Sequence, residues 1–197
     1  MTVNKSTPEF AALKQNPHKI RERRENNLEL AIGYYEQLLK VYTRQAKPYE
    51  WAASCNNLAE TYEKRIRGQH AENLERAISL YEQSLEVYRH QVFPLEWARS
   101  INNLAVAYSS RIRGQRAENL EQAISLYKQA QKVLTPQAFP EKWATSMNNL
   151  AETYRRRIKG ERSENLERAI FFEEQAQKVL TLQTFPGKWA TSIAGLA

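Results

Sequence analysis

Cysteine, glycine and proline are scarce in this sequence, and long apolar runs are missing. Cys55 is the only cysteine among 197 residues, which excludes an internal disulfide. Six glycines and seven prolines are too few for a disordered or collagen-like chain. No apolar run reaches the about 18 residues of a transmembrane helix, and the N-terminal stretch lacks the apolar core of a signal peptide. These features predict a folded chain in a reducing cytoplasm, with no membrane partner.

Sequence signatures of catalysis and metal binding are also missing. The chain has no zinc-ligand spacing, no P-loop, no Gly-x-Ser-x-Gly motif and no paired histidine and cysteine. The three histidines, His18, His70 and His90, are scattered along the chain. We therefore expect a protein that is not an enzyme and that uses no cofactor and no metal.

What the sequence does contain is a repeat. Four tryptophans recur at intervals of 46 residues: Trp51, Trp97, Trp143 and Trp189. Near-identical segments follow the first three of them, and a second leucine-containing segment recurs with the same period. A fixed period of this length indicates a repeat array, in which each unit packs on its neighbours.

Both recurring segments have the apolar periodicity of amphipathic helices. In the first segment, apolar residues form one stripe from Trp97 to Ile112, and in the second they do so from Leu120 to Leu134. Proline begins the first helix and a glycine follows it, as expected for a helix start and a left-handed C-cap. Cys55 occupies an otherwise apolar position of the stripe, so we expect a buried thiol and not a nucleophile.

These helices predict an all-α fold, a right-handed superhelical solenoid of antiparallel helix hairpins. Residues 1–24 would form an N-terminal cap segment, and residues 25–197 would form the repeat domain. In chain order we expect a leading helix B, three hairpins and a truncated helix A: 25–46, 48–91, 94–136, 140–182 and 186–197.

The repeated residues resemble the tetratricopeptide signature. Leu104-Ala105-x-x-Tyr108 matches its helix A, and Ala123-x-x-x-Tyr127-x-x-Ala130 matches its helix B. The usual repeat has about 34 residues, whereas this one has 46. The chain is thus similar to the longer tetratricopeptide-like repeats of large bacterial, notably cyanobacterial, proteins. For function, the resemblance implies a non-catalytic scaffold that binds protein or peptide in the concave groove of its A helices.

An asparagine pair recurs in the tryptophan-containing helices: Asn56 and Asn57, Asn102 and Asn103, Asn148 and Asn149. Helical geometry places these amides beside the apolar stripe, towards the inner face. An amide donates and accepts hydrogen bonds, so a row of amides can hold a peptide backbone. The resemblance implies this use for the asparagine just before the helix A leucine, which corresponds to Asn57, Asn103 and Asn149. Arg99 and Thr145, on the same predicted face, complete the candidate peptide-binding site.

The alternative is that each asparagine bonds a neighbouring helix and only fixes the packing. Two adjacent residues of a helix cannot face the same way, so we expect one asparagine of each pair to be structural. Glu60 and Glu152 lie on the same predicted face and would repel a terminal carboxylate. We therefore do not expect the carboxylate clamp that the resemblance would otherwise suggest.

The formal net charge is +7, and basic residues gather where each tryptophan-containing helix ends. We call this group the basic edge: Arg65, Arg67, Arg111, Arg113, Arg157 and Lys159. Stacked repeats would align these side chains into a stripe that attracts nucleic acid or acidic segments. Alternatively, the cations complement the helix dipole and pair with the glutamates that follow them. No aromatic side chain is interleaved to stack bases, so we favour the structural interpretation.

Three functional hypotheses follow, of which the peptide-binding scaffold is the first. The second is a scaffold that binds nucleic acid along the basic edge. The third is an oligomerisation or spacer segment of a larger signalling protein, which associates with itself through the truncated helix 186–197.

Overall fold

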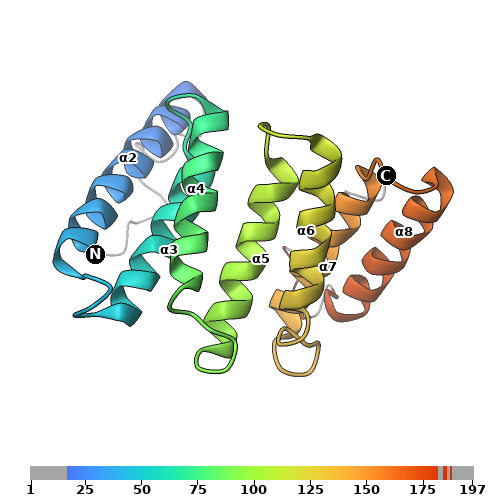
Figure 1. Ribbon diagram of the computed structural model, residues 1–197. Helices are drawn as coiled ribbons and strands as arrows, with labels where there is room; N and C mark the ends of the chain where they lie inside the picture. The colour runs from blue at the N-terminus through green and yellow to red at the C-terminus, as the bar shows by residue number, and fades with distance from the viewer. Residues whose placement is uncertain (1–16, 182–183, 186, 188–197) are drawn as a thin grey trace.

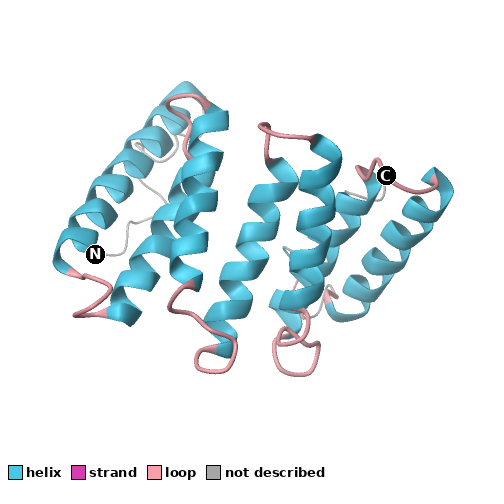
Figure 2. Cartoon of the chain, viewed as in Figure 1, coloured by secondary structure: helices cyan, strands magenta, loops and turns pink. Residues whose placement is uncertain are grey.

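The structure, a computed structural model, describes residues 17–181, 184–185 and 187. Seven helices and no strand occur among these residues (Figure 2). In chain order they are α2 (Pro17–Val41), α3 (Pro48–Lys64), α4 (His70–Leu85), α5 (Pro94–Ser110), α6 (Arg116–Ala130), α7 (Pro140–Arg155) and α8 (Arg162–Val179).

The helices form a row of hairpins (Figure 1). Three consecutive pairs pack most extensively, namely α3 with α4, α5 with α6 and α7 with α8. The tryptophan-containing helices α3, α5 and α7 also contact one another in sequence, α3 with α5 and α5 with α7. This confirms the predicted all-α solenoid, in which each repeat packs mainly on its neighbours.

The apolar stripes predicted from the sequence form the core. One continuous cluster of buried side chains runs from Ile32 in α2 to Ala169 in α8. In α5 its members include Ala98, Ile101 and Leu104, which recur at helical spacing. Each of the helices α3, α5 and α7 has proline in its first turn, where the missing N–H removes no helical hydrogen bond.

The turn between the two helices of a repeat differs from the predicted C-cap. Gly68, Gly114 and Gly160 each have φ +78°, the left-handed conformation that was expected. However, α5 ends at Ser110, and its C-cap residue Arg111 is already extended, so Gly114 lies within the connecting turn. Because the helix has ended by then, Ile112 at the end of the predicted stripe is 60% exposed and is not part of the core.

A buried asparagine at the start of the following helix fixes this turn. The Asn119 Nδ2 atom donates a hydrogen bond of 2.8 Å to the carbonyl of Arg113. The equivalent Asn73 and Asn165 make the same bond to the carbonyls of Arg67 and Lys159 at 2.9 and 3.0 Å. The repeat therefore stabilises its turn with a side chain from the second helix.

The two ends of the predicted domain are only partly described. Helix α2 begins at Pro17, so residues 17–24, assigned from the sequence to the cap segment, are helical. The remainder of the cap segment lies outside the described residues, as does almost all of the predicted truncated helix 186–197.

Replacing Gly114 by Ala should lower the free energy of unfolding by about 1–2 kcal/mol, because a β-carbon is strained at this positive φ. The control is Gly33→Ala in the interior of α2, where no atom lies within 4 Å of the new β-carbon. That change should stabilise the chain by about 0.5–1 kcal/mol. Denaturant unfolding followed by circular dichroism measures both, and equal effects would contradict the assignment of a strained turn.

Candidate functional site

Helices α3, α5 and α7 line an open cavity of about 520 Å³, which we call the central groove. Its lining residues are Glu60, Glu63, Lys64, Tyr81, Arg99, Asn102, Asn103, Val106, Leu134, Glu141, Lys142, Thr145 and Asn149. The size falls in the range of about 300–1,000 Å³ that is typical of ligand pockets. Apart from Tyr81 and Leu134, every lining residue comes from one of the three tryptophan-containing helices.

The structure brings five of the eight predicted peptide-binding residues to this groove: Arg99, Asn102, Asn103, Thr145 and Asn149. The other three lie elsewhere. Asn56 and Asn57 line a smaller cavity of about 290 Å³ between α3 and α5, and Asn57 also lines one of about 240 Å³ beside α2. Asn148 is partly buried and is not among the residues that line the central groove.

In the interface between α3 and α5, the first asparagine of the pair, Asn56, contributes to helix packing. Asn56 is only 8% exposed, and its Oδ1 atom accepts a hydrogen bond of 2.9 Å from Ser100 Oγ on α5. The position one repeat later is different. Asn102 Oδ1 and Ser146 Oγ, the equivalent two atoms, are both buried, and neither has a hydrogen-bond partner within the described residues. The bond that joins α3 to α5 is therefore not made between α5 and α7, where the central groove opens.

These two serines allow a matched test. Ser100→Ala removes the donor and leaves the buried Asn56 oxygen unpaired, so the free energy of unfolding should fall by about 1–3 kcal/mol. Ser146→Ala removes a hydroxyl that makes no hydrogen bond, so the change should stay within about 0.5 kcal/mol. Denaturant unfolding of both variants measures the difference. Equal losses would show that the second bond is also made in solution.

Glu63 is a mostly buried carboxylate in the wall of the groove. Its Oε2 atom accepts a hydrogen bond of 3.3 Å from the Tyr81 hydroxyl. Burial raises the pKa of Glu63 to about 7, Glu60 adds to the rise, and the bond from Tyr81 opposes it. Glu60 itself pairs with Lys64. In the described part of the chain, no basic side chain forms an ion pair with Glu63.

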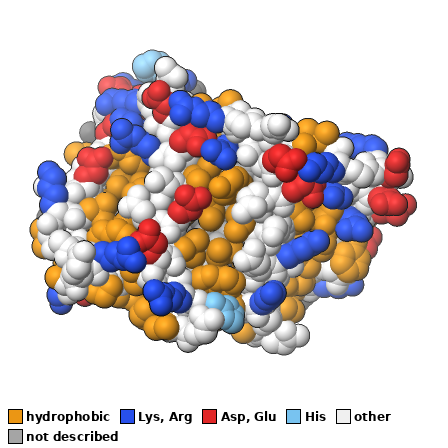
Figure 3. Space-filling model, viewed as in Figure 1, with side chains coloured by type: hydrophobic (Ala, Val, Ile, Leu, Met, Phe, Trp, Pro, Cys, Tyr) orange, Lys and Arg blue, Asp and Glu red, His pale blue; other side chains and the backbone are white. Residues whose placement is uncertain are grey.

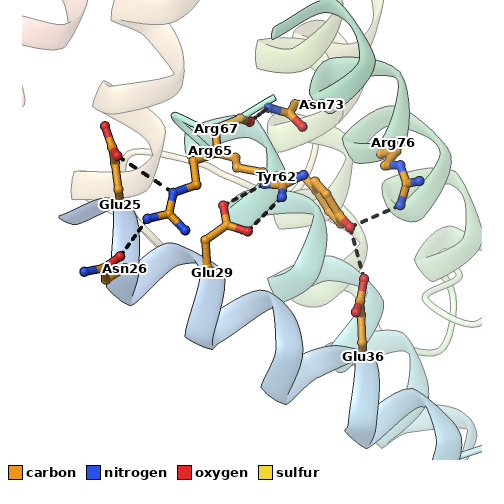
Figure 4. A network of polar contacts seen from close by, with 9 residues as sticks. All are labelled: Glu25, Asn26, Glu29, Glu36, Tyr62, Arg65, Arg67, Asn73 and Arg76. Atoms are coloured by element: carbon orange, nitrogen blue, oxygen red, sulfur yellow. Dashed lines mark hydrogen bonds and ion pairs between the residues drawn. The ribbon is translucent and has the colours of Figure 1, made fainter. Parts of the chain in front are cut away.

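The basic edge proves to be a row of ion pairs. Arg65, Arg111 and Arg157 each bind one glutamate of the preceding helix through two hydrogen bonds of 2.7–3.0 Å. Their respective partners are Glu29, Glu75 and Glu121. Figure 4 shows the first of these pairs, with Arg65 between Glu29 and the ring of Tyr62. The arginine bonds lower the pKa of all three carboxyl groups.

The outer three cations of the basic edge also face the preceding helix. Arg67 donates to Asn26 Oδ1 at 2.8 Å and lies 3.8 Å from Glu25 (Figure 4). Arg113 lies 3.9 Å from Glu72, and Lys159 lies 2.7 Å from Glu118. The expected partners were the glutamates that follow in sequence. The observed partners lie before the basic residues in sequence, on the preceding helix. The turn directs the basic edge back over the previous repeat.

This pairing balances the charge of the basic edge and supports its structural interpretation. Basic and acidic side chains are also interspersed on the face shown in Figure 3, where no continuous basic stripe is visible. The pairs join consecutive repeats, since each arginine belongs to one repeat and its glutamate to the one before. The basic edge therefore gives the nucleic-acid hypothesis no support.

A double-mutant cycle on Arg111→Met and Glu75→Gln should give a coupling of about 0.5–1 kcal/mol, because this two-point pair is about three-quarters shielded from solvent. The control cycle is Arg113→Met with Glu72→Gln, a pair at 3.9 Å with both side chains more than half exposed. Its coupling should be close to zero. Urea unfolding of the four variants and the two doubles measures both couplings. A larger coupling for the exposed pair would contradict the assignment.

Glu63 and Tyr81 belong to the site although no pattern in the sequence predicted them there. Glu63 shares its repeat position with Ser109 and Arg155, so no periodic signal marked it. The structure places Cys55 as expected, fully buried, and burial raises the pKa of its thiol to about 12. Among the described side chains, no three His, Cys, Asp or Glu residues are grouped so as to hold a metal ion.

Comparison with known families assigns the fold. The family model described as Tetratricopeptide repeat matches residues 51–91, 97–130 and 143–170, just over half of the chain. The chain belongs to the tetratricopeptide repeat family. Each match begins at a repeat tryptophan and covers most of one hairpin, so the family assignment follows the same units as the structure. A search of curated proteins gave no match.

Tetratricopeptide repeats generally mediate protein–protein interactions, which agrees with a scaffold role. As to membranes, none of the helices between residues 17 and 181 is long and apolar enough to span a bilayer. The last described helix leaves apolar side chains uncovered by the described residues. Leu166 and Ile170 are 36% and 49% exposed, whereas the equivalent Leu120 and Ile124 are buried by the next hairpin. Self-association through residues 186–197 stays a prediction.

Proposed function

We propose that this tetratricopeptide repeat chain is a non-catalytic scaffold that binds an extended segment of a partner protein in the central groove. The observation that carries the proposal is the gathering of the polar side chains of Arg99, Asn103, Thr145 and Asn149 around one cavity. These residues belong to two different helices, so only the stacking of the repeats brings them together.

The chemistry of the groove suits a peptide backbone. Asn103 and Asn149 are partly buried, and each amide offers a donor and an acceptor to a chain that exposes both groups. Helices hold these side chains in place before binding, which reduces the conformational entropy lost on association. Val106, which is partly exposed, adds apolar area to the same wall.

A library of random peptides displayed on phage tests this function. Selected peptides should crosslink to a photoreactive residue placed at Val106 in the groove and not to one placed at the exposed Ser125 on α6. The double variant Asn103→Ala/Asn149→Ala should weaken binding of such a peptide by about tenfold or more, because two hydrogen bonds are lost.

The control is Gln122→Ala/Ser125→Ala, two exposed polar residues of α6 away from the groove. It should leave the affinity unchanged, and both double variants should keep the helical circular dichroism of the parent. If selected peptides bind the Asn103→Ala/Asn149→Ala variant as tightly as the parent, the proposed function is wrong.

A further inference from the structure

At one pair of equivalent positions, one on each helix of a repeat, the side chains differ from one hairpin to the next. In the third hairpin it brings Arg155 of α7 to Glu173 of α8, with Arg155 Nη2 at 2.6 Å from Glu173 Oε2. Glu173 is only 5% exposed, and burial raises its pKa while Arg155 opposes the rise. In this hairpin, the buried carboxylate is therefore neutralised by a guanidinium.

The second hairpin has no charge at this position, because Ser109 and Tyr127 replace the pair. The first hairpin has Glu63 and Tyr81, so its carboxylate meets a phenol and no cation. Burial raises the pKa of Tyr127 in the next hairpin, and Glu63 adds to that rise. Of the three equivalent positions, only that of Glu63 carries a charge without an opposite partner.

In the described part of the chain, no charged group near Glu63 forms an ion pair with it. Glu60 raises the pKa of Glu63, and Lys64 lowers it by less, while the Lys64 ammonium itself pairs with Glu60. Arg99 lies at another part of the groove, close enough to Tyr49 and Tyr88 to oppose the rise in pKa that burial causes there. Neither Arg99 nor Lys142 contributes to the pKa of Glu63.

We propose that a lysine or arginine side chain of the bound peptide enters the central groove and forms an ion pair with Glu63. Val106, partly exposed in the same cavity, provides an apolar contact for the aliphatic part of such a side chain. The cavity of about 520 Å³ is large enough to hold it. This inference rests on the proposed function, since it names the chemistry of the ligand for the same groove.

The test uses the phage-displayed peptide library with the parent protein and with Glu63→Gln, which keeps the shape and removes the charge. Peptides selected by the parent should share a lysine or arginine at one position. For a synthetic peptide from this set, replacing that residue by norleucine should weaken binding to the parent by about tenfold or more. The same replacement should change the affinity for Glu63→Gln by less than about twofold. Glu72→Gln, an exposed glutamate of α4 that does not line the groove, is the control and should behave as the parent does.

Proton release gives a second, independent readout. In the protein without a bound peptide, the pKa of Glu63 is about 7, so its carboxyl group is partly protonated near that pH. Pairing with a cation favours the ionised form, so binding should release protons. Calorimetry in buffers of different ionisation enthalpy detects this release, which should be absent with Glu63→Gln.

The outcomes separate this inference from the function on which it rests. If no selected peptide depends on Asn103 and Asn149, both are overturned. If peptides bind in the groove without a shared basic residue, or if norleucine weakens the parent and Glu63→Gln equally, only the pairing with Glu63 is wrong. Selection of the shared basic residue with loss of the norleucine effect in Glu63→Gln supports it.

Discussion

The apolar stripe shared between neighbouring repeats is the constraint on which the rest of this structure depends. No hairpin can cover both of its stripes alone, so each must stack on the next in a fixed 46-residue register. That register decides every longer-range contact. It sets Arg111 against Glu75 and Asn56 against Ser100, and it brings asparagines from separate repeats to one groove.

Most of the fold could be predicted from the sequence because its determinants are periodic. Prolines at helix starts and the apolar stripes fixed the number and order of the helices in the described region. The turn was harder, since a glycine signals positive φ but does not show that α5 has already ended at Ser110. The partners of the basic edge were also missed, because they depend on how the turn directs the arginines over the preceding helix.

The candidate site was predictable where it repeats and where a residue shares the predicted face of the asparagines. Asn103 and Asn149 were found through their period, and Arg99 and Thr145 through that face, whereas the pair formed by Glu63 and Tyr81 was not. Their charge balance depends on burial and on which side chain faces them from another helix, and a single sequence shows neither. The period from which the fold was predicted therefore does not mark Glu63, the residue that distinguishes the first repeat from the others.

The unmade contact between Asn102 and Ser146 has a mechanical consequence. In a solenoid, the small rotation from one repeat to the next sets the curvature of the whole array. The bond from Ser100 to Asn56 ties α3 to α5 near the middle of both helices. Without the equivalent bond, α5 and α7 are joined instead by Thr153 Oγ1 and Ser109 Oγ, 3.5 Å apart, near the C-terminal ends of both helices. Two successive steps of one repeat array are therefore tied at different places along their helices.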